Sequence, residues 1–409
     1  MKILLVSTSD LRGGAAIAAY RLLEGLCASG VDAKMLVTEK LSHNDRVVPI
    51  GGALQNKWNF YYERGDIFMK NRLSRKNLFD VSTANTGVRI TNTPEFKEAD
   101  VVHLHWINQG MLSLDEIGRV LSSGKKVVWT MHDMWAFTGI CHHAAGCTNF
   151  HQSCGMCPYL SAPTAKDISY KTFRKKQEVY SKGNITFVAC SEWLRDLAVQ
   201  SPLTKNHSVV SVPNPIDTSV YRPKDKYTIR HEMRLPKDKR VILFAAAKVS
   251  DKRKGIDYLI DAAKMLAKRD SANILFVVAG GDGDEILSHL SFSSYNLGYV
   301  DSAKMVDLYN VADLFVTPSL QENLPNTIME AMSCGTACVG FDIGGIPEMI
   351  QHKSTGYVAR YKDTEDLANG ISWVLNESDA ETLSSNSREF VVRNYTQEKI
   401  VKTYLDIYG

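Results

Sequence analysis

The sequence lacks any apolar run that could cross a membrane, because no stretch approaches the roughly 18 uncharged apolar residues that a spanning helix requires. It also lacks an excess of charge: 48 Lys and Arg residues face 45 Asp and Glu residues, for a formal net charge of +3. That balance argues against a dedicated nucleic-acid-binding protein. Repeats and low-complexity tracts are missing as well, and 44% of the 409 residues are hydrophobic, so the sequence predicts two or three ordinary folded domains.

The first residues lack the features of a signal peptide. The apolar run 3–6 is too short for one, and Asp10 and Arg12 follow it closely. A buried first strand is the better interpretation, which predicts a cytoplasmic protein, soluble or bound peripherally at the inner face of the cell membrane. A basic and aromatic segment, 57–76, is the candidate for a membrane contact, with a solvated helical face as the plainer alternative.

Short β-branched runs alternate with helical patterns along the chain, which is typical of βαβ units and parallel sheets. In the first half we predict a helix at 15–29 and strands at 3–7, 33–37, 100–104, 126–130, 185–189 and 209–212. In the second half we predict helices at 256–268 and 326–333 and strands at 241–246, 274–279, 314–317 and 337–341. The predicted fold class is therefore α/β, with two Rossmann-like, doubly wound domains facing a cleft.

Two prolines, Pro213 and Pro215, interrupt this alternation and mark the best candidate for a linker. The predicted domains are accordingly 1–212 and 213–395, followed by a helix at 396–409 that packs back on the first domain. Ligands of open parallel sheets bind at the carboxyl ends of the strands, so the functional site is expected there.

A G-x-G-x-x-G dinucleotide fingerprint is also missing, which argues against a dehydrogenase. Glycines do follow several predicted strands, at Gly13–Gly14, Gly280–Gly283 and Gly344–Gly345. A glycine lets the backbone approach a ligand closely, but ordinary turns between strands and helices use glycine too. Each loop alone is a weak indicator.

The most informative stretch is 318–335, where a strand ends, a polar loop follows and a helix begins near Asn326. The amides of Asn326 and Thr327 and the positive end of the helix dipole predict a site for a diphosphate. Glu330 lies one turn further, placed to bind ribose hydroxyls, and Glu322 lies in the loop, placed to bind sugar hydroxyls. Two exposed glutamates beside a helix start are the alternative.

A basic loop, 247–255, follows the first strand of the second domain. Its Lys248 and Lys254 would lie at the carboxyl end of a parallel strand, where the ligand crevice is expected. Lysines there would neutralise diphosphate oxygens as point charges. A solvated surface loop is the alternative.

Together these motifs resemble those of the family 4 glycosyltransferases, which are retaining enzymes of the GT-B fold. The matching features are Glu322 and Glu330 with Ala331-Met332 and Cys334-Gly335, then Lys254-Gly255, Gly344-Gly345 with Pro347-Glu348, and Asn214-Pro215-Ile216-Asp217. The first half is similar to a subgroup that builds bacterial surface polysaccharides such as colanic acid and O-antigen chains. That similarity rests on His103-Leu104-His105-Trp106 and on the run from His132-Asp133-Met134-Trp135 to Cys154-Gly155-Met156-Cys157-Pro158.

The resemblance implies roles in the second domain. Glu330 would bind the donor ribose and Glu322 the transferred sugar, while Lys254 and the amides of Asn326 and Thr327 would bind the diphosphate. Lys248 stands where the family usually has Arg, so the charge is kept but the bidentate fork is lost.

In the first domain the resemblance implies that His132 reaches the donor sugar from the opposite domain, and Gly14 joins the donor-binding candidates. A capped structural histidine is the alternative for His132. The catalytic candidates are therefore His132, Glu322 and Lys254. Catalysis is expected to need no metal, because lysines and the helix dipole stabilise the departing phosphates.

We thus expect transfer of a sugar from a UDP or GDP donor, with retention, to a saccharide or lipid-linked acceptor. The setting would be bacterial surface polysaccharide synthesis, such as lipopolysaccharide or capsule. A nucleotide-sugar epimerase on the same fold is the runner-up, although no pattern supplies its base. A zinc-dependent nucleic-acid-binding module is disfavoured by the balanced charge, and we expect no nucleic-acid partner.

Four of the eight cysteines crowd into one short segment that interrupts the first domain at 141–158: Cys141, Cys147, Cys154 and Cys157. The terminal Cys-x2-Cys is a common zinc half-site, and four thiolates would form a closed structural site. Two disulfides or free thiols are the alternatives. Zinc is favoured because a cytoplasmic chain meets reducing conditions.

Overall fold

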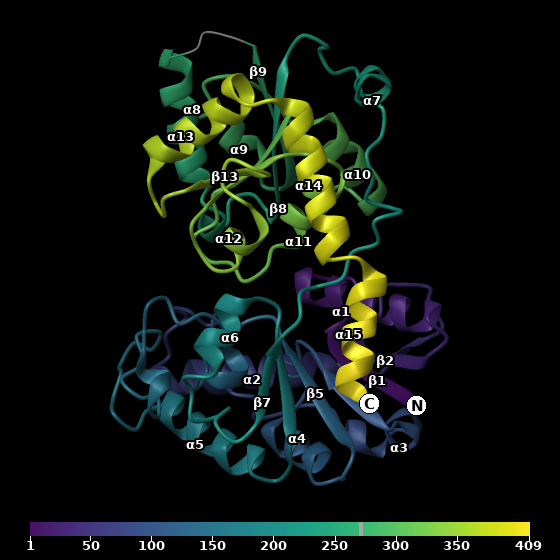
Figure 1. Cartoon of the computed structure of the whole chain (residues 1–409). Helices are drawn as coiled ribbons and strands as arrows, with labels where there is room; N and C mark the ends of the chain where they lie inside the picture. Colours follow the sequence, from purple (N-terminus) through teal and green to yellow (C-terminus); the bar gives the residue numbers. More distant parts are fainter. Residues whose placement is uncertain (270–272) are drawn as a thin grey trace. The chain divides into compact units, whose positions relative to one another are not determined.

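The computed structural model describes residues 1–269 and 273–409, with Glu285 described only by its backbone. The chain divides into two compact units (Figure 1). The first comprises Met1–Asn214 together with Ile400–Gly409, and the second comprises Pro215–Lys399. The division falls inside the segment that the two prolines mark as a linker. Each unit contains one parallel sheet between helices, so the predicted α/β class with two doubly wound, Rossmann-like units is confirmed.

The first unit is built on a seven-stranded parallel sheet in the order β3-β2-β1-β4-β5-β6-β7. Its strands are β1 (Lys2–Ser9), β2 (Asp32–Glu39), β3 (Val47–Pro49), β4 (Val101–Leu104), β5 (Lys126–Met131), β6 (Ile185–Ala189) and β7 (Ser208–Ser211). Its helices are α1 (Gly14–Ala28), α2 (Ala53–Lys70), α3 (Pro94–Glu98), α4 (Leu114–Leu121), α5 (Ile168–Tyr180) and α6 (Glu192–Ala198). The short edge strand β3 was not predicted.

Helices cover both faces of this sheet, which explains why its central strands are continuously apolar. Along β1, Leu4 and Val6 join a core cluster with α4 and α5, whereas Ile3 and Leu5 join a cluster with α1 and α15 (Gln397–Tyr408). Successive side chains of a strand point to opposite faces, so one short apolar run supports two cores.

The final helix, α15, adds polar contacts to its apolar packing on the first unit. The Tyr404 hydroxyl lies 2.8 Å from Thr130 Oγ1, and the Tyr408 hydroxyl lies 2.6 Å from His103 Nδ1. These buried groups satisfy one another, and an unsatisfied buried hydroxyl or imidazole would cost about 1–3 kcal/mol.

The second unit is built on a six-stranded parallel sheet in the order β10-β9-β8-β11-β12-β13. Its strands are β8 (Arg240–Lys248), β9 (Ile274–Gly281), β10 (Ser293–Asn296), β11 (Leu314–Thr317), β12 (Cys338–Phe341) and β13 (Gly356–Ala359). Its helices are α7 (Lys226–Glu232), α8 (Ile256–Arg269), α9 (Asp284–Leu287), α10 (Ser302–Val311), α11 (Asn326–Ser333), α12 (Ile346–Met349), α13 (Thr364–Ser372) and α14 (Ala380–Asn394). The edge strands β10 and β13 were not predicted.

Each sheet has a point where the strand order reverses, between β1 and β4 in the first unit and between β8 and β11 in the second. Loops that leave the carboxyl ends of these strand pairs part there and form a crevice, which is where open α/β sheets bind ligands. A ligand site is therefore expected at the reversal point of each unit.

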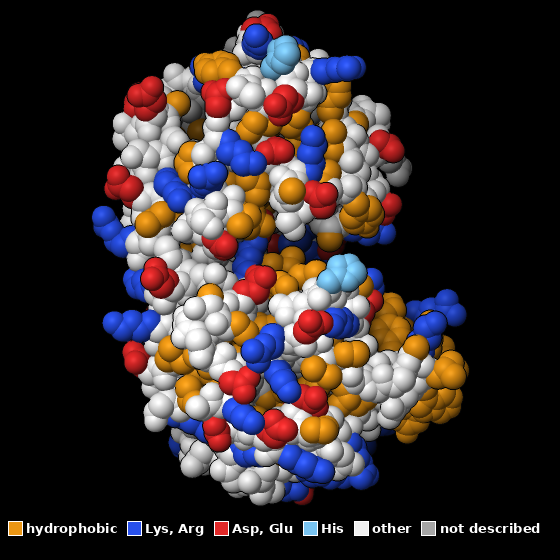
Figure 2. Space-filling model, turned by 90° about the vertical axis from the view of Figure 1, so that its right-hand side faces the viewer, with side chains coloured by type: hydrophobic (Ala, Val, Ile, Leu, Met, Phe, Trp, Pro, Cys, Tyr) orange, Lys and Arg blue, Asp and Glu red, His pale blue; other side chains and the backbone are white. Residues whose placement is uncertain are grey.

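The surface carries mixed charge. Lys and Arg side chains are interspersed with Asp and Glu over the face drawn in Figure 2, as the near-balance of charges in the sequence predicts. Among the residues that the structure describes, no helix is both long enough and apolar enough to span a lipid bilayer.

Candidate functional site

Two predicted site residues of the second unit meet at its reversal point. Lys254 follows β8 in a short 3-10 turn, Lys252–Lys254, and Glu322 lies in the loop after β11. The ammonium of Lys254 pairs with Glu322 Oε1, and the hydroxyl of Ser319 donates to the same oxygen at 3.1 Å. The side chains of Lys254 and Glu322 are 35% and 14% exposed, so the pair is reachable from solvent yet held in place.

Close backbone contacts fix the loop that carries Glu322. Gly255, at φ 70°, lies so near the loop that a Cβ there would be 1.8 Å from the Pro318 carbonyl oxygen. Gly344, at φ 60°, leaves only 2.0 Å between a hypothetical Cβ and the Glu322 carbonyl oxygen. Both positions require glycine for their left-handed backbone and for space. The Lys254-Gly255 and Gly344-Gly345 motifs therefore shape this loop through contact.

The helix α11 begins beside the same loop, where the sequence predicts a diphosphate site. It starts at Asn326 after Pro325, which supplies no side-chain cap to the first turn. Thr327 is half-buried in that turn, and the positive end of the dipole lies here. The first turn thus has the composition of an anion-binding helix start.

Glu330 is held by a residue that the sequence analysis missed. Its carboxylate is 7% exposed, and the Tyr309 hydroxyl on α10 donates to its Oε2 at 2.8 Å. Burial and the neighbouring Glu330 charge raise the pKa of Tyr309 well above its ordinary value, so this hydroxyl stays a donor. Tyrosine carries no positional signal in the motif, and only the packing of α10 on α11 places it.

Lys248, at the end of β8, has a partner that the sequence did not indicate. Its ammonium lies 3.0 Å from Asp282 Oδ2, and its side chain is 63% exposed. The hydrogen bond and charge of Asp282 raise the pKa of Lys248. The structure therefore joins Lys248 to the Gly280–Gly283 loop by an exposed ion pair, whereas Lys254 pairs with Glu322.

In the first unit, histidines line the ends of β4 and β5. His105 Nδ1 lies 3.1 Å from His132 Nε2, and the Cys190 thiol lies 3.5 Å from His132 Nδ1. Burial lowers the pKa of His103 to about 3, with a smaller contribution from His132. Burial also lowers the pKa of half-buried His132 to about 4, against the opposing charge of Asp133. These imidazoles are neutral at physiological pH.

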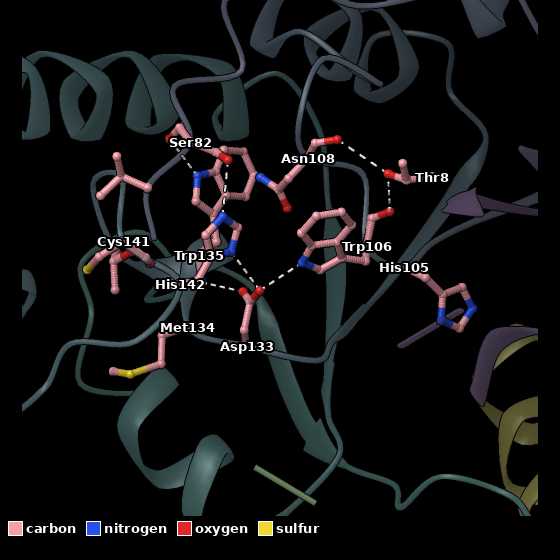
Figure 3. A network of polar contacts seen from close by, with 12 residues as sticks. Thr8, Ser82, His105, Trp106, Asn108, Asp133, Met134, Trp135, Cys141 and His142 are labelled. Carbon is pink, nitrogen blue, oxygen red and sulfur yellow. Dashed lines mark hydrogen bonds and ion pairs between the residues drawn. The ribbon is translucent and has the colours of Figure 1, made fainter. Parts of the chain in front are cut away.

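Asp133, next to His132, organises a polar network (Figure 3). Its Oδ2 accepts from the Trp106 indole at 2.9 Å and lies 2.7 Å from His142 Nδ1, while its Oδ1 accepts from the Trp135 amide at 2.8 Å. Burial alone would raise the pKa of Asp133, but the charge and hydrogen bond of His142 outweigh it and hold that pKa well below its usual range. The network links the two sequence segments that carry the polysaccharide-subgroup resemblance.

The loop after β1 forms the other side of the first unit's reversal point. Gly14 begins α1, and Gly13 before it has φ 91° with open space where a Cβ would lie. Buried Asp10 accepts from the amides of Leu41 and Ser42, both at 2.9 Å, which ties this loop to the end of β2. The glycine turn thus leaves its outer side accessible, as its place among the donor-binding candidates requires.

The four clustered cysteines lie around one small cavity of about 20 Å³, which Cys141, Cys147, Cys154 and Cys157 all line. They are free thiols in the structure. Burial raises the pKa of Cys141 to about 12 and that of Cys154 and Cys157 to about 11. Within residues 1–269 and 273–409, no three His, Cys, Asp or Glu side chains are arranged to hold a metal ion. As they lie, the thiols share a cavity without forming a zinc site.

Residues 225–390, nearly all of the second unit, match the family model described as Glycosyl transferases group 1. This region, the group 1 domain, is similar to the glycosyltransferases of that family. The predicted donor residues of the second unit, Lys248, Lys254, Glu322, Asn326, Thr327 and Glu330, all lie in this domain.

Two curated relatives illustrate what the chain is similar to. N-acetyl-alpha-D-glucosaminyl L-malate synthase of Bacillus anthracis is 28% identical over 212 residues, covering 50% of this chain and 54% of the relative. N,N'-diacetylbacillosaminyl-diphospho-undecaprenol alpha-1,3-N-acetylgalactosaminyltransferase of Campylobacter jejuni is 33% identical over 160 residues, covering 38% of this chain and 41% of the relative. The chain spans about half the length of the curated relatives it matches.

The fold extends beyond the group 1 domain. The chain is similar in structure to HepE from Anabaena, which was solved in complex with UDP and glucose. The superposition covers 100% of this chain and 99% of the HepE chain, with a TM-score of 0.65. The two chains are 16% identical, a level at which the likeness shows the fold alone. The fold of the whole chain is therefore GT-B, as the sequence predicts.

The depressed histidine pKa values make a prediction about stability. Because the unfolded chain has histidine pKa values near about 6.5, it binds protons between about pH 6.5 and pH 4 that folded His103 and His132 do not bind. We therefore expect the first unit to lose stability as the pH falls through this window, by up to about 3 kcal/mol for His132. Urea unfolding followed by tryptophan fluorescence measures this loss.

His132→Gln should flatten the dependence of the unfolding free energy on pH, whereas the exposed control His43→Gln should not. Equal slopes in all three proteins would contradict the assignment.

Proposed function

We propose that the chain transfers a sugar from a nucleotide-sugar donor to an acceptor hydroxyl. The observation that carries this proposal is the Lys254–Glu322 pair, held beside the start of α11 in a group 1 glycosyltransferase domain. A cation, a carboxylate and a helix start at one sheet edge supply the contacts that a diphosphate and a sugar need. No observation favours the epimerase alternative.

The proposed chemistry centres on the departing diphosphate. The bond between the anomeric carbon and the phosphate oxygen breaks, an acceptor hydroxyl oxygen bonds to that carbon, and the hydroxyl proton passes to the departing phosphate oxygen. Lys254 and the amides of Asn326 and Thr327 would stabilise the charge that develops on the leaving group. We expect no catalytic metal, because these groups supply the positive charge. Retention of configuration is proposed on the family 4 resemblance.

The remaining site residues have proposed roles that follow from their surroundings. Glu322 would orient sugar hydroxyls, and Glu330, braced by Tyr309, would bind the ribose. His132 remains the catalytic candidate of the first unit. With a pKa of about 4 it is neutral at physiological pH, so we assign it a hydrogen-bonding role and no cationic one. Lys248 and Gly14 complete the proposed donor contacts.

We infer a UDP-sugar donor, supported by the fold likeness to HepE, whose structure contains UDP; GDP is the alternative. A saccharide or lipid-linked acceptor in surface polysaccharide synthesis is supported by the Campylobacter relative, whose name contains a diphospho-undecaprenol acceptor. Such an acceptor would place the protein in the cytoplasm, peripherally at the inner face of the cell membrane.

A membrane contact is supported by the surface of α2. Its exposed stripe is apolar: Leu54 (85% exposed), Trp58 (69%) and Tyr61 (67%) follow one another at intervals of four and three residues, and Met69 (66%) lies about two turns further along. Its buried face instead carries Asn59, Glu63 and Arg64 beside Ile67. This distribution is the reverse of an ordinary surface helix, and aromatic side chains beside basic ones suit a lipid interface.

The donor site predicts the behaviour of two variants. Lys254→Ala removes a cationic contact to the diphosphate and Glu330→Gln a charged contact to the ribose, so each should weaken UDP binding by about tenfold to a hundredfold. Isothermal titration calorimetry measures the affinity, and thermal unfolding reports the fold. The control Lys252→Ala, in the same basic turn, should bind UDP like the wild type. Wild-type affinity in both site variants would show that the donor-site assignment is wrong.

The α2 stripe predicts binding to lipid. The wild type should float with vesicles that contain anionic lipid, and Trp58→Ser with Tyr61→Ser should lower the bound fraction about tenfold, because two aromatic rings are lost. Tyr227→Ser with Tyr299→Ser, two comparably exposed tyrosines of the second unit, is the matched control. Equal flotation of both double variants would remove the membrane contact.

We also propose that the clustered cysteines bind one structural zinc ion. Their shared cavity and the amide of Gly139, 3.2 Å from Cys154 Sγ, support this, whereas the present arrangement of the side chains does not. Four thiolates would leave no position open for substrate. Elemental analysis of protein purified without chelator should then find one zinc per chain, and cysteine-to-serine changes at Cys154 and Cys157 should remove it. Protein without zinc that keeps eight reactive thiols after denaturation would refute the proposal.

A further inference from the structure

A second cavity, lined by none of the predicted site residues, lies in the first unit. It has a volume of about 500 Å³, within the range of small-molecule sites. Its walls come from the end of α2, the segment 83–85, the start of α4, and the segment 160–175 that includes the start of α5. All of these belong to the first unit.

The cavity is strongly cationic. Its lining includes five basic side chains, Lys70, Arg72, Lys166, Lys171 and Lys175, and a single carboxylate, Asp167. That carboxylate caps α5: Asp167 Oδ1 accepts from the Ser169 amide at 2.9 Å, and Oδ2 accepts from the Cys157 amide at 2.9 Å. The negative charge of Asp167 is therefore engaged by backbone amides.

Three of the five cations have no acidic partner. Lys70 pairs with Asp66 at 2.7 Å and Lys175 with Asp115 at 2.9 Å. Arg72, Lys166 and Lys171 form no ion pair with any residue in the described part of the chain. In a protein whose charges are otherwise nearly balanced, like charges around one hollow repel one another unless an anion joins them.

A buried hydroxyl in the same wall also lacks a partner. Thr83 is 7% exposed, and its Oγ1 makes no hydrogen bond to the residues that the structure describes. The backbone around it is fixed, because Glu63 Oε1 accepts from the amides of Thr83 and Ala84, both at 2.8 Å. An unsatisfied buried hydroxyl costs about 1–3 kcal/mol, so a ligand oxygen beside it would relieve that cost.

Two buried, charged side chains of α2, Glu63 and Arg64, position this wall. Glu63 and Arg64 form an ion pair at 3.0 Å inside the unit, and Arg64 Nη1 donates to the Val81 carbonyl oxygen at 2.9 Å. The same helix exposes Met69, and Leu73 is exposed just beyond it, next to the cavity residues Lys70 and Arg72. A cationic hollow therefore adjoins an exposed apolar helix surface.

We propose that this cavity binds the phosphate or diphosphate group of a lipid-linked ligand, with the exposed apolar residues of α2 against its hydrocarbon chain. Five cations and an orphan hydroxyl suit phosphate oxygens, and the adjoining apolar stripe suits an amphiphile more than a free sugar phosphate. This inference rests on the proposed function, which it deepens by assigning a binding site to the phosphate of a lipid-linked acceptor.

The test uses calorimetric titration of the full chain in saturating UDP, so that the donor site is occupied. Farnesyl diphosphate should bind, inorganic pyrophosphate should bind about tenfold more weakly, and farnesol should not bind measurably. Lys166→Gln with Lys171→Gln should weaken farnesyl diphosphate binding about tenfold or more. The matched control, Arg174→Gln with Lys205→Gln, removes two exposed charges outside the cavity and should bind like the wild type.

A further variant separates ligand binding from stability. Thr83→Val keeps the shape of the side chain but deletes the unsatisfied hydroxyl, so it should weaken farnesyl diphosphate binding several-fold without lowering the unfolding midpoint. Wild-type binding in the Lys166/Lys171 double variant, or pyrophosphate binding as tight as farnesyl diphosphate binding, would overturn the proposal. Binding lost in Lys254→Ala but kept in that double variant would assign the ligand to the second unit, which also overturns it. Failure of the wild type to bind UDP would instead refute the proposed function.

Discussion

The close approach of two glycines to one loop is the constraint on which the candidate donor site depends. Gly255 and Gly344 leave no room for a side chain against the carbonyl groups of Pro318 and Glu322. A neighbouring bond reinforces the contact, since the Gly345 amide donates to the Asn323 carbonyl oxygen at 2.7 Å. The loop 318–323 is thereby held by two other chain segments. The carboxylate of Glu322 reaches Lys254 because the backbone beneath it has no alternative path.

The first unit is constrained differently, because it buries ionisable groups. Asp133 keeps its charge because His142, Trp106 and a backbone amide surround it. Lys176 is fully buried, and its ammonium donates to the carbonyl oxygens of Trp135 and Thr138 at 2.5 and 3.0 Å. Burial lowers the pKa of Lys176 to about 7, so the charged form of this lysine is much less favoured than that of a lysine in water. Polar interiors of this kind are costly unless every partner is in place, and they specify a single arrangement.

The sequence predicted the regular parts of the fold well, because apolar periodicity determines them. β6, β11 and α11 have the predicted bounds, and the other central elements differ by a few residues. The edge strands β3, β10 and β13 escaped prediction because they are only three or four residues long and mostly lack a buried apolar run. Motif spacing predicted that Lys254 and Glu322 would lie at one sheet edge. It did not predict the contacts of Tyr309 with Glu330 or Asp282 with Lys248, since these depend on how separate elements pack. The cationic cavity was not predicted for the same reason, because its lysines and arginine come from segments far apart in the sequence.

The order of residues along the chain has a consequence for synthesis. The first unit is discontinuous: its last helix is completed only after the whole second unit has been synthesised. Until then, His103 and Thr130 lack the tyrosine hydroxyls that satisfy them, and one face of the sheet lacks the apolar side chains of Ile400 and Val401. The second unit, in contrast, is continuous in sequence and has all its strands available earlier. A nascent chain is thus expected to leave the first unit incomplete, and open to chaperones, until α15 has been made.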